Sequence, residues 1–262
     1  MTAMTVAGPA TQARVVRSEW TKFRSLRSSW WTVAVAVLLT VGLGVLLTFA
    51  AASETGSSEV PRDVAARSEI GAIFAQLTLG VLAILLICGE YGTGMIRASM
   101  AVVPRRLPVL WGKIAVYVGV VLPLTMVTSF AAFLLGQLAW RAKGRPAVSL
   151  ADPDVLRIIT GAALYLTVAG ILALAIGAII RNTAASITVL ATLFFVLPTV
   201  LQAMPAGVAE AGPYLPSNAG GALGGIAIVN HPLSPWPGFA LLCGYTAVAV
   251  VVAVRRLRQT DV

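Results

Sequence analysis

The chain has 262 residues, of which 58% are hydrophobic and 11% are charged, and its mean hydropathy is +0.89. A soluble domain of this length cannot bury that much apolar surface, so the composition excludes a soluble globular protein and indicates an integral membrane protein. The formal net charge of +9 does not indicate a nucleic-acid partner, because the Lys and Arg residues flank apolar segments as the positive-inside rule predicts.

The N-terminal region predicts an amphipathic helix before the first membrane span. Residues 1–13 carry no pattern, and we expect them to be disordered. In residues 14–29, polar and apolar side chains separate onto two faces at about 100° per residue, which predicts an interfacial helix in the headgroup plane. Glu19 falls on the apolar face, and either a pair with Lys22 or a contact with a partner protein would explain it. The residues expected to define this helix are Arg17, Glu19, Trp20, Lys22, Phe23 and Arg24.

Six apolar segments are long enough to cross a bilayer. Pro123 should bend the third and Pro198 the fifth. A cleaved signal peptide is the rival interpretation of the first segment, because alanines at 50–52 resemble a cleavage site, but the apolar stretch exceeds the usual length of about 7–15 residues. The sequence thus predicts an all-α polytopic membrane protein with one six-helix domain, residues 30–254. Its spans are residues 30–50, 68–88, 113–140, 155–180, 183–204 and 236–254.

The distribution of basic residues predicts the orientation of these spans. With both termini on the inside, 13 of the 19 Lys and Arg residues lie in inside segments. The C-terminal tail, residues 255–262, contributes three of them: Arg255, Arg256 and Arg258. We therefore expect a multi-pass protein of the cell membrane with cytoplasmic N- and C-termini.

A polar and basic interval, residues 89–113, separates the second and third spans. Thr93 can cap a short helix, and Pro104 must end it. Ile96, Met100 and Val103 form one apolar stripe on this helix. The basic residues around the stripe are Arg97, Arg105, Arg106 and Lys113. The interval therefore predicts an amphipathic helix at the cytoplasmic membrane face, which presents its apolar side to a protein groove or to lipid headgroups.

The segment between the fifth and sixth spans is rich in Gly and Pro and carries almost no charge. Its central run, residues 219–229, is too short to cross a bilayer, so we expect a re-entrant or interfacial segment on the far side. A flexible surface loop is the alternative. The glycines expected to shape this segment are Gly220, Gly221, Gly224 and Gly225.

Several kinds of chemistry lack support in the sequence. No phosphate-binding G-x-x-x-x-G-K-[ST] loop occurs, so any ATP hydrolysis must take place on another chain, and we do not expect an enzyme. The middles of the spans carry no Asp, Glu, Lys, Arg or His, so the sequence gives little support to an ion-coupled transporter. The single histidine, His231, lies with Ser217 and Ser234 in a loop, so proteolysis is not expected. Cys88 and Cys243 have no metal-ligand spacing, and we expect neither a metal site nor a disulfide.

The chain resembles membrane subunits of ABC-2 type ATP-binding-cassette transporters, especially those of actinobacteria. The resemblance rests on the opening RSEWTKFRSLRSSWW, the interval ending MAVVPRRLPVLWGK, the tail RRLRQTD and the six spans in order. It implies that the interval after the second span is a coupling helix docked on a separate nucleotide-binding subunit. It also implies that two copies of this ATPase bind ATP and Mg, that two membrane subunits pair, and that re-entrant helices lie between spans five and six.

The resemblance assigns roles to residues of the coupling interval. Glu90 corresponds to the acidic residue that opens the segment, although a carboxylate facing water at a helix end is the plain alternative. Arg105 and Arg106 are also explained by membrane orientation alone. The residues assigned to coupling are Glu90, Thr93, Ile96, Arg97, Met100, Val103, Pro104 and Arg105, with Lys113 at the exit.

Together these patterns predict the permease subunit of an ABC transporter, which pairs with itself or with a similar subunit. The resemblance implies export of a hydrophobic or amphipathic solute such as a drug, an antibiotic or a lipid-like molecule. Two other functions stay open from the sequence: an ion-coupled secondary transporter, and a membrane anchor or assembly factor without transport activity.

Overall fold

A computed structural model describes residues 12–25, 27–54, 60–92 and 107–259. Every regular element in these ranges is helical, and six helices are long and apolar enough to span a membrane. This confirms the predicted all-α fold class with six transmembrane helices. The six are Arg27–Ala52, Pro61–Gly89, Leu107–Arg141, Val155–Ile180, Thr183–Gln202 and Pro235–Gln259.

The first and fifth spans are each divided by a π-helical turn. The first consists of α2 (Arg27–Leu38), η1 (Leu39–Leu43) and α3 (Gly44–Ala52). The fifth consists of α9 (Thr183–Ala191), η2 (Thr192–Val196) and α10 (Leu197–Gln202), so Pro198 stands just after a π turn. A π turn widens the backbone locally, which accommodates the carbonyl that a proline leaves without its donor.

Two other segments differ from the sequence-based expectation. The stretch between the predicted first and second spans includes most of α4 (Pro61–Ser68), which begins with a proline at its first helical position, where no N–H is needed. The helix of the third span, α7 (Leu107–Arg141), begins six residues before the predicted start at residue 113 and continues through Pro123. A transmembrane helix can retain an internal proline when its neighbours satisfy the freed carbonyl.

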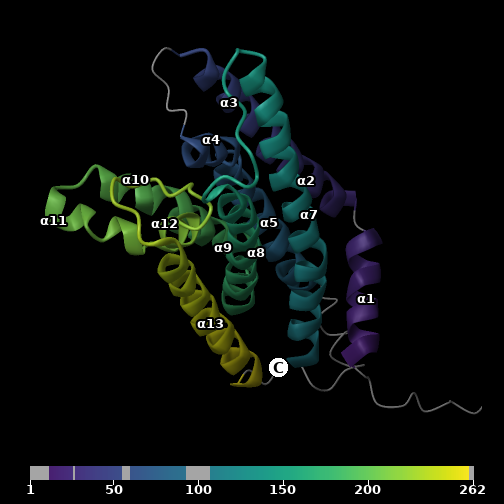
Figure 1. Cartoon of the computed structure of the whole chain (residues 1–262). Coiled ribbons are helices and arrows are strands. Elements are labelled where there is room, and N and C mark those ends of the chain that lie inside the picture. Colours follow the sequence, from purple (N-terminus) through teal and green to yellow (C-terminus); the bar gives the residue numbers. More distant parts are fainter. Residues whose placement is uncertain (1–11, 26, 55–59, 93–106, 260–262) are drawn as a thin grey trace, which may run out of the picture.

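The remaining described elements complete the order along the chain (Figure 1). α1 (Gln12–Ser25) precedes the first span, and α5 (Ala72–Gly92) follows α4 in the second. α8 (Val155–Ile180) forms the fourth span and α13 (Pro235–Gln259) the sixth. Three short helices lie between the fifth and sixth spans: α11 (Ala206–Ala209), η3 (Gly212–Tyr214) and α12 (Pro216–Gly221).

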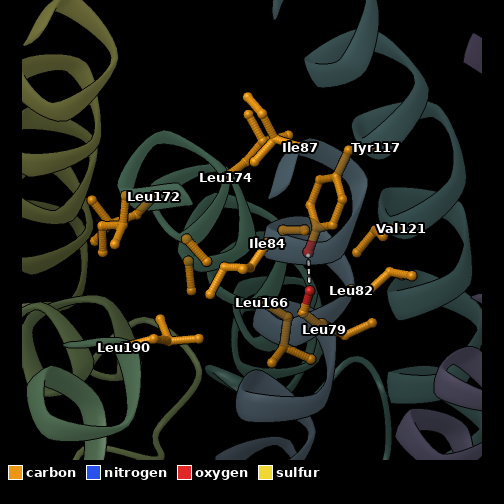
Figure 2. Close-up of a cluster of buried hydrophobic side chains, with 14 of the residues drawn as sticks. Leu79, Leu82, Ile84, Ile87, Tyr117, Val121, Leu166, Leu172, Leu174 and Leu190 are labelled. Atoms are coloured by element: carbon orange, nitrogen blue, oxygen red, sulfur yellow. Dashed lines mark hydrogen bonds between the residues drawn. The ribbon is translucent and has the colours of Figure 1, made fainter. Parts of the chain in front are cut away.

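The core is organised around α8, which is the most buried of the six spans and packs against α5, α7, α12 and α13. Small residues permit this close packing, because a helix without side-chain bulk lets a neighbour approach its backbone. At Gly170, the ring of Tyr117 from α7 occupies the space a Cβ would take. The Tyr117 hydroxyl donates to the Leu79 carbonyl of α5 at 3.3 Å, within a cluster of apolar side chains (Figure 2).

The two ends of the bundle differ in what they contain. One end, here called the basic end, holds α1, the start of α7 at Leu107 and the end of α13 at Gln259, in the lower part of Figure 1. The Arg181 side chain, in the turn between α8 and α9, donates to the Arg256 carbonyl there at 3.3 Å. The opposite end, here called the far end, holds α3, α4 and the end of α7 at Arg141.

Candidate functional site

The predicted coupling segment lies between two helices that reach the basic end. α5 ends at Gly92 and α7 begins at Leu107, so residues 93–106 connect spans two and three. Residues 93–106 and the side chain of Glu90 lie outside what the structure describes. Seven assigned residues are among these: Thr93, Ile96, Arg97, Met100, Val103, Pro104 and Arg105. The coupling helix therefore stays a prediction. The structure describes the helices that flank it, which are α1, α5 and α7.

α1 packs alongside the first turns of α7 (Figure 1). Gln12 Nε2 donates to the Pro108 carbonyl at 3.1 Å. Farther along, Gly112 lets α1 approach closely, since a Cβ there would lie 3.0 Å from a Val15 methyl group and 3.6 Å from Glu19 Cγ. Val15 and Phe23 are buried. The apolar face of the amphipathic helix is thus covered by protein at these positions, and its orientation to a bilayer stays a prediction.

A buried ion pair joins this helix to the start of the third span. Lys113 Nζ donates to Glu19 Oε2 at 2.7 Å, and the two side chains are only 4% and 6% exposed. Lys113 Nζ also donates to the Leu86 carbonyl of α5 at 2.8 Å. One ammonium group therefore holds α1, α5 and α7 together, six residues after the start of α7 at Leu107.

The same carboxylate binds a second cation. Lys22 Nζ donates to Glu19 Oε1 at 2.8 Å, which confirms the pairing of residues three apart that the sequence suggested. Each carboxylate oxygen of Glu19 thus accepts from one lysine. Removing one partner of a buried pair typically costs about 3–5 kcal/mol, because the other charge stays buried without compensation.

The opposite face of α1 is exposed, basic and aromatic. Arg17 and Arg24 are exposed, and Trp20 is 46% exposed with its ring centroid 6.3 Å from that of Phe23. Trp30 Nε1 donates to the Arg24 carbonyl at 3.2 Å across the junction with α2. An exposed face of this composition suits lipid headgroups or an acidic protein surface.

The glycine-rich segment at residues 216–224 is buried. Helix α12 begins at Pro216 and ends at Gly221, so it overlaps only the first three residues of the expected run, residues 219–229. A Cβ at Gly220 would meet Tyr165 and Leu242, and one at Gly224 would lie 2.9 Å from the Ala162 backbone. Gly221 is also buried, and Gly225 has φ +67, a conformation that favours glycine. This burial favours a packed segment over the flexible-loop alternative, while its re-entry into a bilayer stays a prediction.

Two polar side chains that the sequence did not single out hold this segment. Asn218 Nδ2 donates to the Gly212 carbonyl at 2.9 Å, and its Oδ1 accepts from the Ile228 N–H at 3.1 Å. Arg157 Nη1 donates to the Leu223 carbonyl at 2.9 Å. The sequence offered two signals for these contacts. Asn218 is an amide within a Gly-rich run, and Arg157 is a lone arginine at the start of an apolar span.

A polar contact between α5 and α8 lies beside a small cavity of about 10 Å³. The Tyr165 hydroxyl donates to Gln76 Oε1. Ser217, Asn218 and apolar side chains complete the cavity lining. The volume is that of about one water molecule, so this cavity has no space for a larger solute.

A comparison with protein-family models identifies the family. The model described as "ABC-2 family transporter protein" matches residues 15–200, which is more than two thirds of the chain and includes α1, the first four spans and most of the fifth. None of the curated proteins compared with the chain matches it. The six-helix architecture and this match agree with each other, and the chain belongs to the ABC-2 family of membrane transport proteins.

Proposed function

We propose that the chain is the permease subunit of an ABC exporter, driven by ATP that a separate subunit hydrolyses. Two copies of a cytoplasmic ABC ATPase, each with bound ATP and Mg, would dock at the basic end, and a second copy of this chain would complete the transport path in the cell membrane. Both termini would then be cytoplasmic. The family membership supports the permease role, and the partners and their number belong to the proposal.

The observation that carries the proposal is the three-helix junction at Lys113. A force applied to residues 93–106 would reach both α5 and α7, and the Glu19–Lys113 contact at 2.7 Å would transmit it to α1. Through α1 it would reach the first span, because α2 follows within two residues. ATP binding would thereby tilt three spans together as packed bodies.

The cargo would be a hydrophobic or amphipathic solute. The walls of the bundle are predominantly apolar, and the polar groups between α5 and α8 are uncharged amides and hydroxyls such as Gln76 and Tyr165. A pathway with such walls favours an apolar body with few hydrogen-bonding groups.

The apolar stripe of the loop provides the test. Ile96→Asp or Met100→Asp should abolish stimulation of ATP hydrolysis by the permease, measured in proteoliposomes that contain the purified ATPase. Burying a carboxylate in an apolar groove costs several kcal/mol, so we expect a loss of about tenfold or more.

Ala98→Asp is the matched control, because residue 98 falls about 200° from Ile96 on a helix, on the opposite face. This variant should retain stimulation. Unchanged stimulation in both stripe variants, with all proteins inserted normally, would contradict the coupling assignment.

A further inference from the structure

Glu69 is a fully buried carboxyl group that the proposed transport cycle does not use. It lies in the turn between α4 and α5, and its exposure is 0%. Neither carboxylate oxygen has a hydrogen-bond partner within the described part of the chain. Because an unpaired buried carboxylate is very costly, such a group in a membrane protein marks a functional site by default.

The surroundings of Glu69 are hydroxyl groups and backbone rather than cations. The Ser129 hydroxyl of α7 faces the carboxyl, and its Oγ is likewise buried without a partner in hydrogen-bond geometry. Next to Glu69, Ser68 packs against Gly136 of α7, and Gly71 packs against the carbonyl groups of Leu39 and Thr40 in η1. The carboxyl therefore lies where a helix break meets a π turn, two features that can rearrange without breaking a regular helix.

The charged groups on the neighbouring elements do not neutralise Glu69. Among the described residues, no Lys, Arg or His forms a salt bridge with Glu69, and Arg67 Nη1 is buried without a hydrogen-bond partner there. Arg67 lies two residues earlier, and residues two apart do not face each other on a helix. Arg157 of α8 is occupied by Asp154 at 3.0 Å and by the Leu223 carbonyl. Lys113 binds Leu86, which is about 25 Å along the helix from Glu69. The other charged residues on α4, α5 and α7 are Arg62, Asp63, Glu90 and Arg141, while η1 and α3 carry none.

We propose that Glu69 is a reversible proton-binding site in the far half of the bundle. The carboxyl holds a proton while the turn between α4 and α5 buries it. The Ser129 hydroxyl faces the carboxyl and can accept a hydrogen bond from the acid or donate one to the carboxylate. When the turn opens to water, the proton leaves as hydronium and the carboxylate is hydrated. The bound species is a proton, so the site needs no further ligand.

Glu19 provides an internal comparison. It is also buried, at 5% exposure, but its carboxyl oxygens accept from Lys113 and Lys22, so two ammonium groups lie beside it. Two buried carboxyl groups in one chain thus differ in their pairing. The proton-binding proposal therefore applies to Glu69, which lacks such partners among the described residues.

Infrared spectroscopy of the full-length chain in detergent tests this without the ATPase. At neutral pH the wild type should show a carboxylic acid C=O band that Glu69→Gln lacks completely and Glu19→Gln retains. Raising the pH should remove the band reversibly from the folded wild type. Glu69→Asp, which keeps an acid, should keep a shifted band, and size-exclusion chromatography should show that all variants remain folded.

The proposal is overturned if the wild type shows no acid band at neutral pH or if Glu69→Gln retains the full band. It is also overturned if the wild-type band persists unchanged at every pH at which the protein stays folded. None of these outcomes depends on the partner ATPase, so failure here is distinguishable from failure of the proposed transport function.

Discussion

At the residue scale, α1 is held to the bundle by an ion pair between residues far apart in the sequence, Glu19 and Lys113. The sequence placed Glu19 on the apolar face of its helix and suggested Lys22 as its partner, and that pair is present at 2.8 Å. It did not suggest Lys113, which is 94 residues away and equally close. The available signal was a pair of opposite charges: Glu19, on the apolar face of the helix before the first span, and Lys113, at the start of the third span. Pairing the two requires the tertiary arrangement, which local periodicity does not contain.

Lys113 gives the prediction at this scale. Lys113→Met should lower the free energy of unfolding by about 3–5 kcal/mol, because Glu19 stays buried with only Lys22 beside it. Denaturation in mixed micelles measures the change. Lys22→Met is the matched control, since its side chain is 34% exposed, and it should lose less than about 1 kcal/mol.

The double variant Glu19→Gln with Lys113→Met should recover most of the loss, because both charges are then gone. An equal loss in Lys22→Met and Lys113→Met would show that the Lys113 ammonium is not the buried partner described here.

At the element scale, the length of the apolar segments predicts the transmembrane helices, but it does not predict the π turns that divide two of them. Segments of about 20 apolar residues predict spans because a bilayer requires that length of helix. The π turns η1 and η2 leave no comparable pattern, since one residue inserted in a helical turn hardly changes the hydrophobic periodicity. Low charge predicted a re-entrant or interfacial segment at residues 219–229, but not its contacts: Arg157 of α8 donates to the Leu223 carbonyl, and Asn218 donates to the Gly212 carbonyl.

Gly161 gives the prediction at this scale. A Cβ there would lie 2.6 Å from the Leu223 carbonyl oxygen, which is backbone and cannot rotate away. Gly161→Ala should therefore destabilise the protein by about 1–3 kcal/mol by forcing α8 and the segment after α12 apart. Gly244→Ala in α13 is the matched control, because nothing lies within 4 Å of its added methyl.

The control should be neutral or stabilising by up to about 1 kcal/mol, as expected for a glycine inside a helix. Thermal unfolding in detergent measures both variants. A stable Gly161→Ala protein would mean that the segment after α12 is not held against α8 in solution.

At the scale of the whole molecule, apolar length predicted the six spans, and the resemblance of the chain predicted the ABC-2 family, which the family match over residues 15–200 confirms. Glu69 shows the limit of such reasoning. It stands near the end of a predicted span, where a carboxylate normally faces water, yet it is fully buried in the folded chain. Burial of a single side chain at a span end is a property of the assembled bundle.

The central claim is that this chain works as the membrane subunit of an ATP-driven transporter. Its most direct test is gentle detergent purification of the chain from its native host, with mass spectrometry of the proteins that accompany it. The account predicts a stoichiometric soluble ATPase with a phosphate-binding G-x-x-x-x-G-K-[ST] loop. Recovery of the intact chain oligomer without any such ATPase would contradict the account and favour an ion-coupled carrier or a membrane anchor.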